Sequence, residues 1–454
     1  MNIINEYEKL LESKRHSDYS LGFDPLFMPS FLFDYQKALV EWALKKGRCG
    51  IFADCGLGKT PLALVIAQNI AEKTNKNVLI VTPLSVTHEF LKQGEKFGID
   101  IKRSKDGKSK GKITVTNYEK LHMFDPSEYA GNIFDESSII KNPLNKTKYT
   151  VSRFTSKTPY RFLMTATAAP NDYPEFGNSS EVLGNLDYNE MLSTFFRDTS
   201  NDKNPQWSES KYVLKNHAVN NFWKWVTSWA RALRKPSDLG FSDEGFILPD
   251  MEMNLIEVKS KVLLDGYIFY KPAKTNDEQR EEKKKSVESR SEIIAEVMSK
   301  HEFSVAWPHF DSEADYLEKI LPESKQVSGK MSDDQKEEIY DAFSDRKLKY
   351  LIIKPKIGAF GLNWQHCNHT VIYPTHSYEQ AYQGIKRFHR YGQTRKVQVD
   401  IPYTESEMPI IKNFQRKVQQ ADVMFEKMIK FMNDSLTLQK ADRIKKEMVI
   451  PEWI

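Results

Sequence analysis

The residues best suited to chemistry lie where a short apolar run leads into a glycine-rich loop. The loop reads Ala53-Asp54-Cys55-Gly56-Leu57-Gly58-Lys59-Thr60. Glycines let backbone N–H groups wrap around phosphates, and a following helix would point its N-terminus at the same anion. Lys59 is expected to neutralise the β- and γ-phosphates of a nucleotide, and Thr60 to bind Mg²⁺. This P-loop therefore predicts binding of ATP or GTP.

A pair of acidic residues supplies what a P-loop needs for hydrolysis. Asp135 and Glu136 directly follow the apolar residues Asn132-Ile133-Phe134, so they are expected at the end of a strand. Asp135 would contact Mg²⁺ through a water molecule, and Glu136 would polarise the attacking water as general base. Together the two motifs predict a nucleotide-hydrolysing site that uses Mg²⁺.

Short apolar runs that alternate with helical patterns are expected to position these motifs. Parallel strands buried beneath helices have this nearly continuous apolar character. Strands are expected at 50–53, 78–83, 113–116, 132–134 and 161–164, and again at 304–307, 350–353 and 370–373. Helices are expected at 61–73, 314–321 and 333–343. The chain is therefore expected to be of the α/β class, with two units built on mostly parallel sheets.

Further motifs stand in the order found in superfamily 2 helicases, and they most resemble the Snf2-like branch. The matching segments are Phe33-Asp34-Tyr35-Gln36, Val81-Thr82-Pro83, Thr116-Asn117-Tyr118-Glu119, Thr165-Ala166-Thr167 with Pro170-Asn171, Gly358-Ala359-Phe360-Gly361-Leu362-Asn363 and the stretch 383–393. The resemblance covers about residues 31–397. It implies two tandem RecA-like domains with parallel sheets flanked by helices. The chain looks like a compact bacterial or phage-type protein of the DEAD/DEAH-box kind.

The resemblance assigns roles around the nucleotide. Gln36 would read adenine and so select ATP over GTP. Arg387 and Arg390 stand three residues apart, are expected on one face of a helix, and would reach the γ-phosphate as permanently charged guanidinium groups. The residues expected to bind ATP are Gln36, Gly56, Leu57, Gly58, Lys59, Thr60, Gly361, Arg387 and Arg390. The expected catalytic set is Lys59, Asp135, Glu136, Arg387 and Arg390.

DNA, duplex or branched, is the implied macromolecular partner. The residues expected to contact it are Thr82, Pro83, Asn117, Thr165, Lys356 and Asn363. Three departures from the family pattern affect these roles. Ser137-Ser138 stands where a histidine is common, Thr165-Ala166-Thr167 replaces Thr-Gly-Thr-Pro, and Pro355 stands where serine or threonine is usual. Coupling between ATP and DNA is therefore expected to differ in detail.

The expected organisation has five parts. They are an N-terminal segment 1–30, a first RecA-like lobe 31–185, an aromatic-rich helical insertion 186–250, a second lobe 251–403 with a charged insert 271–300, and a C-terminal helical segment 404–454. The tryptophans between 207 and 229 are more typical of a core than of a base-stacking surface. The basic segment 102–112 fits a phosphate contact and a solvated turn equally well.

Composition limits the expected partners and cellular compartment of the protein. The 454 residues include 66 basic and 62 acidic side chains, a net charge of +4 that neither requires nor excludes a nucleic acid. Three cysteines are too few and too scattered for a disulfide framework or a zinc site, so a reducing cytosol is expected, in a bacterial or phage-infected cell. Neither a signal peptide nor a membrane-spanning segment is expected.

The resulting functional prediction is an ATP-driven translocase that moves along duplex DNA to remodel it, migrate branches or displace bound proteins. Two alternatives stay open. One is a strand-separating helicase of a phage replication module, and the other is a non-motor switch whose ATP state regulates a partner. Replication or recombination proteins are further partners to expect, and a membrane is not.

Overall fold

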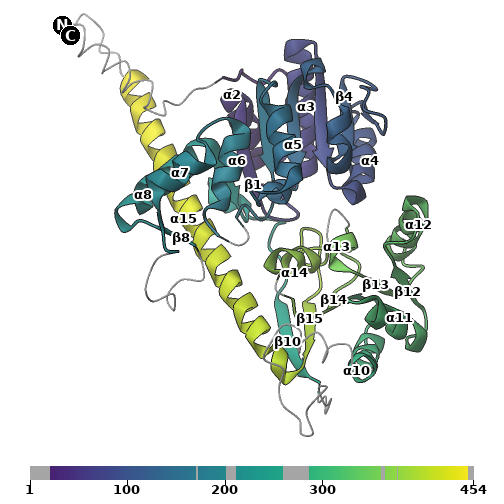
Figure 1. Ribbon diagram of the computed structural model, residues 1–454. Helices are drawn as coiled ribbons and strands as arrows, with labels where there is room; N and C mark the ends of the chain where they lie inside the picture. Colours follow the sequence, from purple (N-terminus) through teal and green to yellow (C-terminus); the bar gives the residue numbers. More distant parts are fainter. Residues whose placement is uncertain are drawn as a thin grey trace, which may run out of the picture. The chain divides into compact units, whose positions relative to one another are not determined.

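The computed structural model describes residues 21–169, 172–200, 211–258, 286–358, 363–375 and 377–447. Contacts divide the chain into two compact units (Figure 1). Unit 1 comprises Met1–Ser242 and Val423–Ile454, and unit 2 comprises Asp243–Asp422. Gly361, Trp207, the pair Pro170-Asn171 and the first half of the predicted insert 271–300 lie outside the described residues.

Unit 1 is built on a seven-stranded sheet with the strand order β3-β4-β2-β5-β6-β1-β9, and all of its pairings are parallel. The strands are β1 Arg48–Ala53, β2 Asn77–Thr82, β3 Ile101–Arg103, β4 Ile113–Asn117, β5 Tyr129–Asp135, β6 Tyr160–Met164 and β9 Ala230–Leu233. The five strands expected in this half of the chain are confirmed. β3 and β9, the two edge strands, were not predicted.

Helices cover both faces of this sheet (Figure 1). They are α2 Asp34–Lys46, α3 Lys59–Thr74, α4 Thr87–Phe97, α5 Lys146–Thr155, α6 Glu175–Leu183 and α8 Val219–Trp229. A further helix, α7 Tyr188–Phe195, packs on α6. α3 packs on β2 and β5, where Gly131 leaves room for the Ile70 side chain. α5, α6 and α8 contribute to a large core cluster beneath the opposite face.

The predicted aromatic-rich helical insertion over 186–250 is only partly helical in its described residues. α7 and α8 lie there, but so do the antiparallel pair β7 (Phe196–Asp198) and β8 (Tyr212–Leu214), and the strand β9. Trp223, Trp225 and Trp229 are buried in the core of unit 1 and pack around Phe222 and Phe176. These three tryptophans therefore belong to the core, as the sequence favoured, and offer no ring to a nucleobase.

Unit 2 repeats the parallel architecture with a six-stranded sheet ordered β10-β15-β14-β11-β13-β12. Its strands are β10 Met251–Glu257, β11 Ser304–Trp307, β12 Ser324–Val327, β13 Tyr350–Ile353, β14 His369–Ile372 and β15 Val397–Tyr403. Its helices are α10 Val287–Ser299, α11 Asp311–Ile320, α12 Asp333–Ser344, α13 Pro355–Gly358 and α14 Tyr378–Ile385. The strands and helices expected in this half are confirmed.

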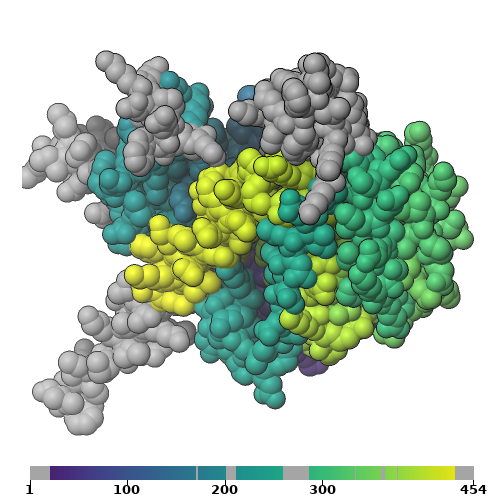
Figure 2. Space-filling model, turned by 90° about the horizontal axis from the view of Figure 1, so that it is seen from below, coloured from purple at the N-terminus to yellow at the C-terminus, as the bar shows by residue number. Residues whose placement is uncertain are grey.

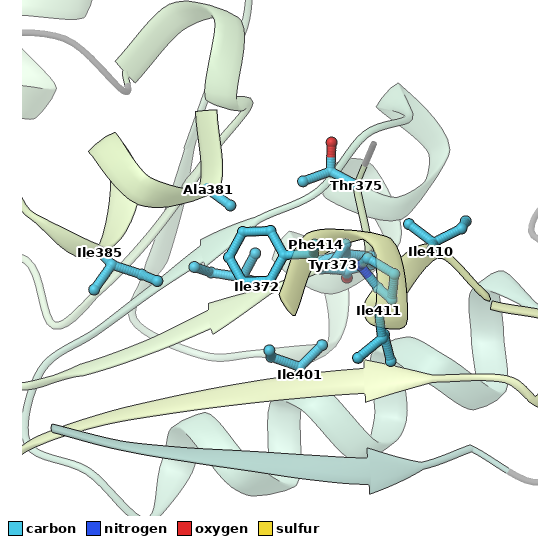
Figure 3. A pocket seen from close by; sticks show the side chains of 10 residues that line it. Ile372, Tyr373, Thr375, Ala381, Ile385, Ile401, Ile410, Ile411 and Phe414 are labelled. Carbon is cyan, nitrogen blue, oxygen red and sulfur yellow. The ribbon is translucent and has the colours of Figure 1, made fainter. Parts of the chain in front are cut away.

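Within the predicted C-terminal helical segment 404–454, the described residues include one long helix, α15 Met408–Glu447, part of which is visible at the surface in yellow in Figure 2. Its first turns close an apolar pocket of unit 2, in which Phe414 faces Ile372 and Ile385 (Figure 3). None of the described helices combines the length and the low charge that a membrane span requires.

Two sets of buried polar side chains in unit 2 bond to one another. His369 is fully buried, with Nδ1 2.7 Å from Ser304 Oγ and Nε2 3.0 Å from Asp400 Oδ2. Arg290 and Glu407 form an equally buried ion pair at 2.9 Å. Because an unpaired buried charge is costly, the bonds of His369 hold β11, β14 and β15 together, and the ion pair holds α10 against the 3-10 helix Glu405–Glu407 that follows β15.

Candidate ATP site

The P-loop connects β1 to α3, the arrangement that the sequence predicted. Gly56 and Gly58 have φ values of +90° and +77°, which a residue with a side chain adopts only at a cost in free energy. Helix α3 begins at Lys59, so the loop turns directly into a helix N-terminus, where backbone N–H groups favour an anion. The geometry fits a nucleotide phosphate.

The charge of Lys59 lies within this loop. Its Nζ donates hydrogen bonds to the carbonyl oxygens of Ala53 at 2.8 Å and Asp54 at 3.3 Å. Thr60 follows in the first turn of α3 and is partly exposed. Neither side chain is buried in the core, and their binding of a phosphate and of Mg²⁺ stays a prediction.

Gln36 and Tyr35 support the P-loop from α2. Gln36 is almost fully buried, and its Nε2 donates to the carbonyl of Leu57 at 3.1 Å. The Tyr35 hydroxyl donates to the same carbonyl at 3.0 Å, and Gln36 Oε1 accepts from Phe33 N at 3.0 Å. A Cβ on Gly58 would lie only 2.2 Å from Gln36 Nε2. The structure thus ties the Gln36 amide to the loop backbone, and sequence reasoning did not identify Tyr35.

The acidic pair lies at the carboxyl end of β5, as predicted. Asp135 is the last residue of the strand, and Glu136 has the left-handed backbone φ 53°, ψ 50°. This conformation is uncommon for a residue with a side chain and is typical of functional sites. Both carboxylates are largely buried. The Tyr118 hydroxyl donates to the Asp135 carbonyl at 2.8 Å, and burial raises the phenol pKa well above its usual value, so it remains a donor.

Two hydroxyl groups hold the Glu136 carboxylate. Ser138 Oγ and Thr165 Oγ1 each donate to Glu136 Oε1 at 2.8 Å. Thr165 follows the end of β6, and its own Oγ1 accepts from Thr167 N at 3.0 Å. The Thr-Ala-Thr motif is therefore linked to the Glu136 carboxylate through the side chain of Thr165. Ser138, which the sequence marked only as a departure, supplies the other bond.

We predict that Ser138→Ala lowers the kcat of ATP hydrolysis about tenfold. A hydrogen bond to a charged group is worth roughly 1.5–3 kcal/mol, and its loss would let the Glu136 side chain turn away from the attacking water. Ser137→Ala is the matched control, because the buried Ser137 hydroxyl has no hydrogen-bond partner among the described residues. Equal effects of the two changes on steady-state turnover would argue against a positioning role for Ser138.

The predicted DNA contacts of unit 1 lie along the same carboxyl edge of the sheet. Thr82 ends β2 and stands opposite Asn117, which ends β4. Thr82, Asn117 and Thr165 are buried, and Pro83 is buried beside them. Thr82 Oγ1 and Asn117 Oδ1 have no hydrogen-bond partner in the described part of the chain. Their contacts to DNA stay a prediction.

In unit 2 the predicted placement of the two arginines on one helix face is wrong. α14 ends at Ile385, and Arg387 and Arg390 lie in the turns that follow it. Arg387 is buried, with Nε donating to the carbonyl of Gln383 at 3.0 Å, and Arg390 is partly exposed. Gln393 fastens these turns, since its Nε2 donates to the carbonyls of Cys367 and Phe388 at 3.0 and 3.2 Å.

The other described residues of unit 2 that were predicted to contact DNA are Lys356 and Asn363. Lys356 is exposed on the short helix α13, and Asn363 is partly exposed. Pro355 begins α13, where its missing N–H removes no helical hydrogen bond.

Comparison with known proteins supports a helicase-like core. Residues 284–392 match the family model of the helicase conserved C-terminal domain. The DNA repair protein RAD5 of Yarrowia lipolytica (strain CLIB 122 / E 150) is 29% identical over 147 residues, which is 31% of this chain. The matched region spans only 14% of that protein.

Two solved structures resemble the chain over most of its length. The Sulfolobus solfataricus SWI2/SNF2 ATPase core in complex with dsDNA shares 17% identity, covers 90% of this chain and 96% of its own, and superposes with a TM-score of 0.42. The Mycobacterium smegmatis helicase Lhr, bound to ssDNA and AMP-PNP, shares 14% identity and covers 86% of this chain and 48% of its own, with a TM-score of 0.53. The likeness to Lhr confirms the predicted fold class of tandem RecA-like domains with helix-flanked parallel sheets.

Proposed function

We propose that this chain is a DNA-dependent ATPase of the Snf2-like kind, which couples ATP hydrolysis to movement along duplex DNA. The observation that carries the proposal is the bonded network at the carboxyl edge of unit 1. The neighbouring strands β1, β6 and β5 bring the P-loop, the Thr165 motif and the acidic pair to this edge, and Glu136 accepts from Thr165 and Ser138. The helicase C-terminal match in unit 2 and the similarity to a DNA repair protein support it.

The residues of unit 1 would divide the chemistry between them. Lys59 and the N–H groups of the P-loop stabilise the charge of the phosphates, and Gln36 and Tyr35 hold that loop in shape. Thr60 and Asp135 offer the hard oxygen ligands that Mg²⁺ prefers, and this ion would neutralise charge on the leaving phosphate. Glu136 accepts the proton of the attacking water.

Arg387 and Arg390 would complete the reaction from unit 2. A guanidinium group keeps its charge and binds phosphate oxygens in a fork, so it suits the charge that develops on the γ-phosphate. If these arginines act on ATP held by Lys59, hydrolysis requires the two units to come together, and that closure is the step that moves the protein along DNA. A nucleotide switch would have no need for the DNA-contacting motifs.

Movement on duplex DNA is tested by comparing triplex displacement with unwinding of a forked duplex, both with ATP. We predict triplex displacement without fork unwinding, because motors of this kind track one strand inside an intact duplex. The described part of the chain also offers no exposed tryptophan from α8 as a wedge. Efficient fork unwinding with stimulation by single strands alone would instead favour the strand-separating replicative helicase.

A further inference from the structure

A strongly basic segment of unit 1 lies outside the ATP site. Residues 100–120 carry seven basic side chains, Lys102, Arg103, Lys105, Lys108, Lys110, Lys112 and Lys120, against three acidic ones, Asp100, Asp106 and Glu119. The resulting net charge of +4 equals the formal net charge of the whole chain, so all other residues together are neutral. Charge concentrated in this way is typical of a surface that binds a polyanion.

Lys105, Lys108, Lys110 and Lys112 lie in the loop 104–112 between β3 and β4, and Lys102 lies in β3 just before it. Hydrogen bonds within the loop fix its shape. Ser104 Oγ donates to Asp106 Oδ1 at 3.0 Å, and Lys108 N donates to the same oxygen at 3.2 Å. Gly107 has a φ of +80°, and a Cβ there would lie 2.5 Å from the carbonyl oxygen of Met123. The loop is therefore packed against the protein, so binding would cost little ordering of its backbone.

The lysines of the loop differ in whether their charge is already neutralised. Lys110 Nζ donates to Asp106 Oδ2 at 2.6 Å, and this bond holds the pKa of that carboxyl well below its usual range. Lys105 and Lys108 are exposed, and within the described residues neither forms an ion pair. Lys102 is also exposed and reaches a carboxylate only at 3.9 Å. Three positive charges are thus available to a partner.

This basic loop starts at the carboxyl edge of the sheet, beside the predicted DNA contacts. Thr116 Oγ1 donates to the carbonyl of Ser104 at 3.1 Å, and Asn117 ends the same strand. Lys120 Nζ donates to the carbonyl of Lys105 at 3.1 Å and so fixes the first residues of the loop. A DNA backbone that follows Asn117 along this edge would meet the loop next.

We propose that Lys102, Lys105 and Lys108 form an accessory contact to the phosphate backbone of duplex DNA. The inference rests on the proposed function and extends the DNA footprint of unit 1 beyond the motifs at the strand ends. Each phosphate contact releases condensed counterions, so each contact makes the DNA affinity fall more steeply as the salt concentration rises. The maximal ATPase rate at saturating DNA should not change, because the edge strand β3 is separated by β4 and β2 from β5, which carries the acidic pair, and lies still farther from β1 and the P-loop.

The test compares the triple variant Lys102→Gln, Lys105→Gln, Lys108→Gln with a control that makes the same charge change in unit 2. Lys319, Lys325 and Lys347 are exposed and belong to none of the candidate sites, so Lys319→Gln, Lys325→Gln, Lys347→Gln is that control. Affinity for a labelled duplex is measured by fluorescence anisotropy over a series of salt concentrations. Thermal melts establish that both variants fold.

The expected result is a plot of log K against log salt that is less steep for the loop variant by roughly 2.7, at about 0.9 for each lost contact. The control should match the wild type, and both variants should reach the wild-type rate at saturating DNA. Equal slopes for loop variant and control would overturn the accessory contact while leaving the proposed function in place. A wild-type protein that does not bind duplex DNA would overturn both.

Discussion

Replacing Glu136 with glutamine should lower the kcat of ATP hydrolysis by roughly 10²–10⁴-fold. The amide can still accept hydrogen bonds from Ser138 and Thr165, so the left-handed turn at the end of β5 should persist. What is lost is the base that takes the proton of the attacking water. ATP and DNA should therefore still bind, and the variant should accumulate in the ATP-bound form.

Single-turnover hydrolysis and equilibrium binding of a fluorescent ATP analogue separate these effects. Glu128→Gln is the matched control, since Glu128 precedes the first residue of β5, is exposed, and lies at the end of the strand opposite to Glu136. The control should keep the wild-type rate. Turnover by Glu136→Gln within a few-fold of the wild type would mean that another residue activates the water.

Replacing Lys59 with alanine should abolish measurable ATP turnover and leave the fold intact. Lys59 is partly exposed, and among the described residues its Nζ bonds only to backbone carbonyls of the P-loop, so its replacement removes no core contact. What the variant loses is stabilisation of the charge on the phosphates, which the ammonium group provides most strongly in the transition state.

Steady-state ATPase assays with a thermal melt as the folding check suffice here. Lys73→Ala, in the last turn of the same helix α3, removes an equal charge away from the loop and should have no effect on turnover. Near wild-type turnover by Lys59→Ala would contradict the assignment of the P-loop.

The P-loop and the acidic pair could be predicted because their chemistry is local. Glycines at 56 and 58 are required by positive φ, and the apolar residues before Asp135 end in a buried strand. Both features depend on neighbouring residues, which the sequence displays directly. The network around Glu136 is different, because Thr165 comes from another strand and only the β5–β6 pairing brings the two together.

Elements set by distant contacts could not be predicted. β9 is only four residues long, contains Arg231, and pairs with β1 far away in the sequence. The Arg231 side chain is buried because its guanidinium bonds to the carbonyl of Thr227 and lies 4.5 Å from the ring of Trp42. The residues of β9 alone do not reveal that Arg231 will contact Thr227 and Trp42.

The end of α14 is a second example. A spacing of three between Arg387 and Arg390 suits a helix, and it suits a series of turns equally well. In the structure this segment forms turns, in which Phe388 is buried in the core of unit 2 and the Gln393 amide bonds to the Phe388 carbonyl. The motif therefore singled out Arg387 and Arg390 as candidate site residues, but it did not predict the backbone conformation in which they lie.

The most direct test of the central claim is the ATPase rate of the wild-type protein with and without duplex DNA at low and high salt. A DNA-dependent motor predicts a low basal rate, a strong increase with duplex DNA that is at least as large as the increase with single strands, and loss of that increase as salt rises. An ATPase rate that is unchanged by any nucleic acid, or the absence of ATP turnover under all of these conditions, would contradict the account.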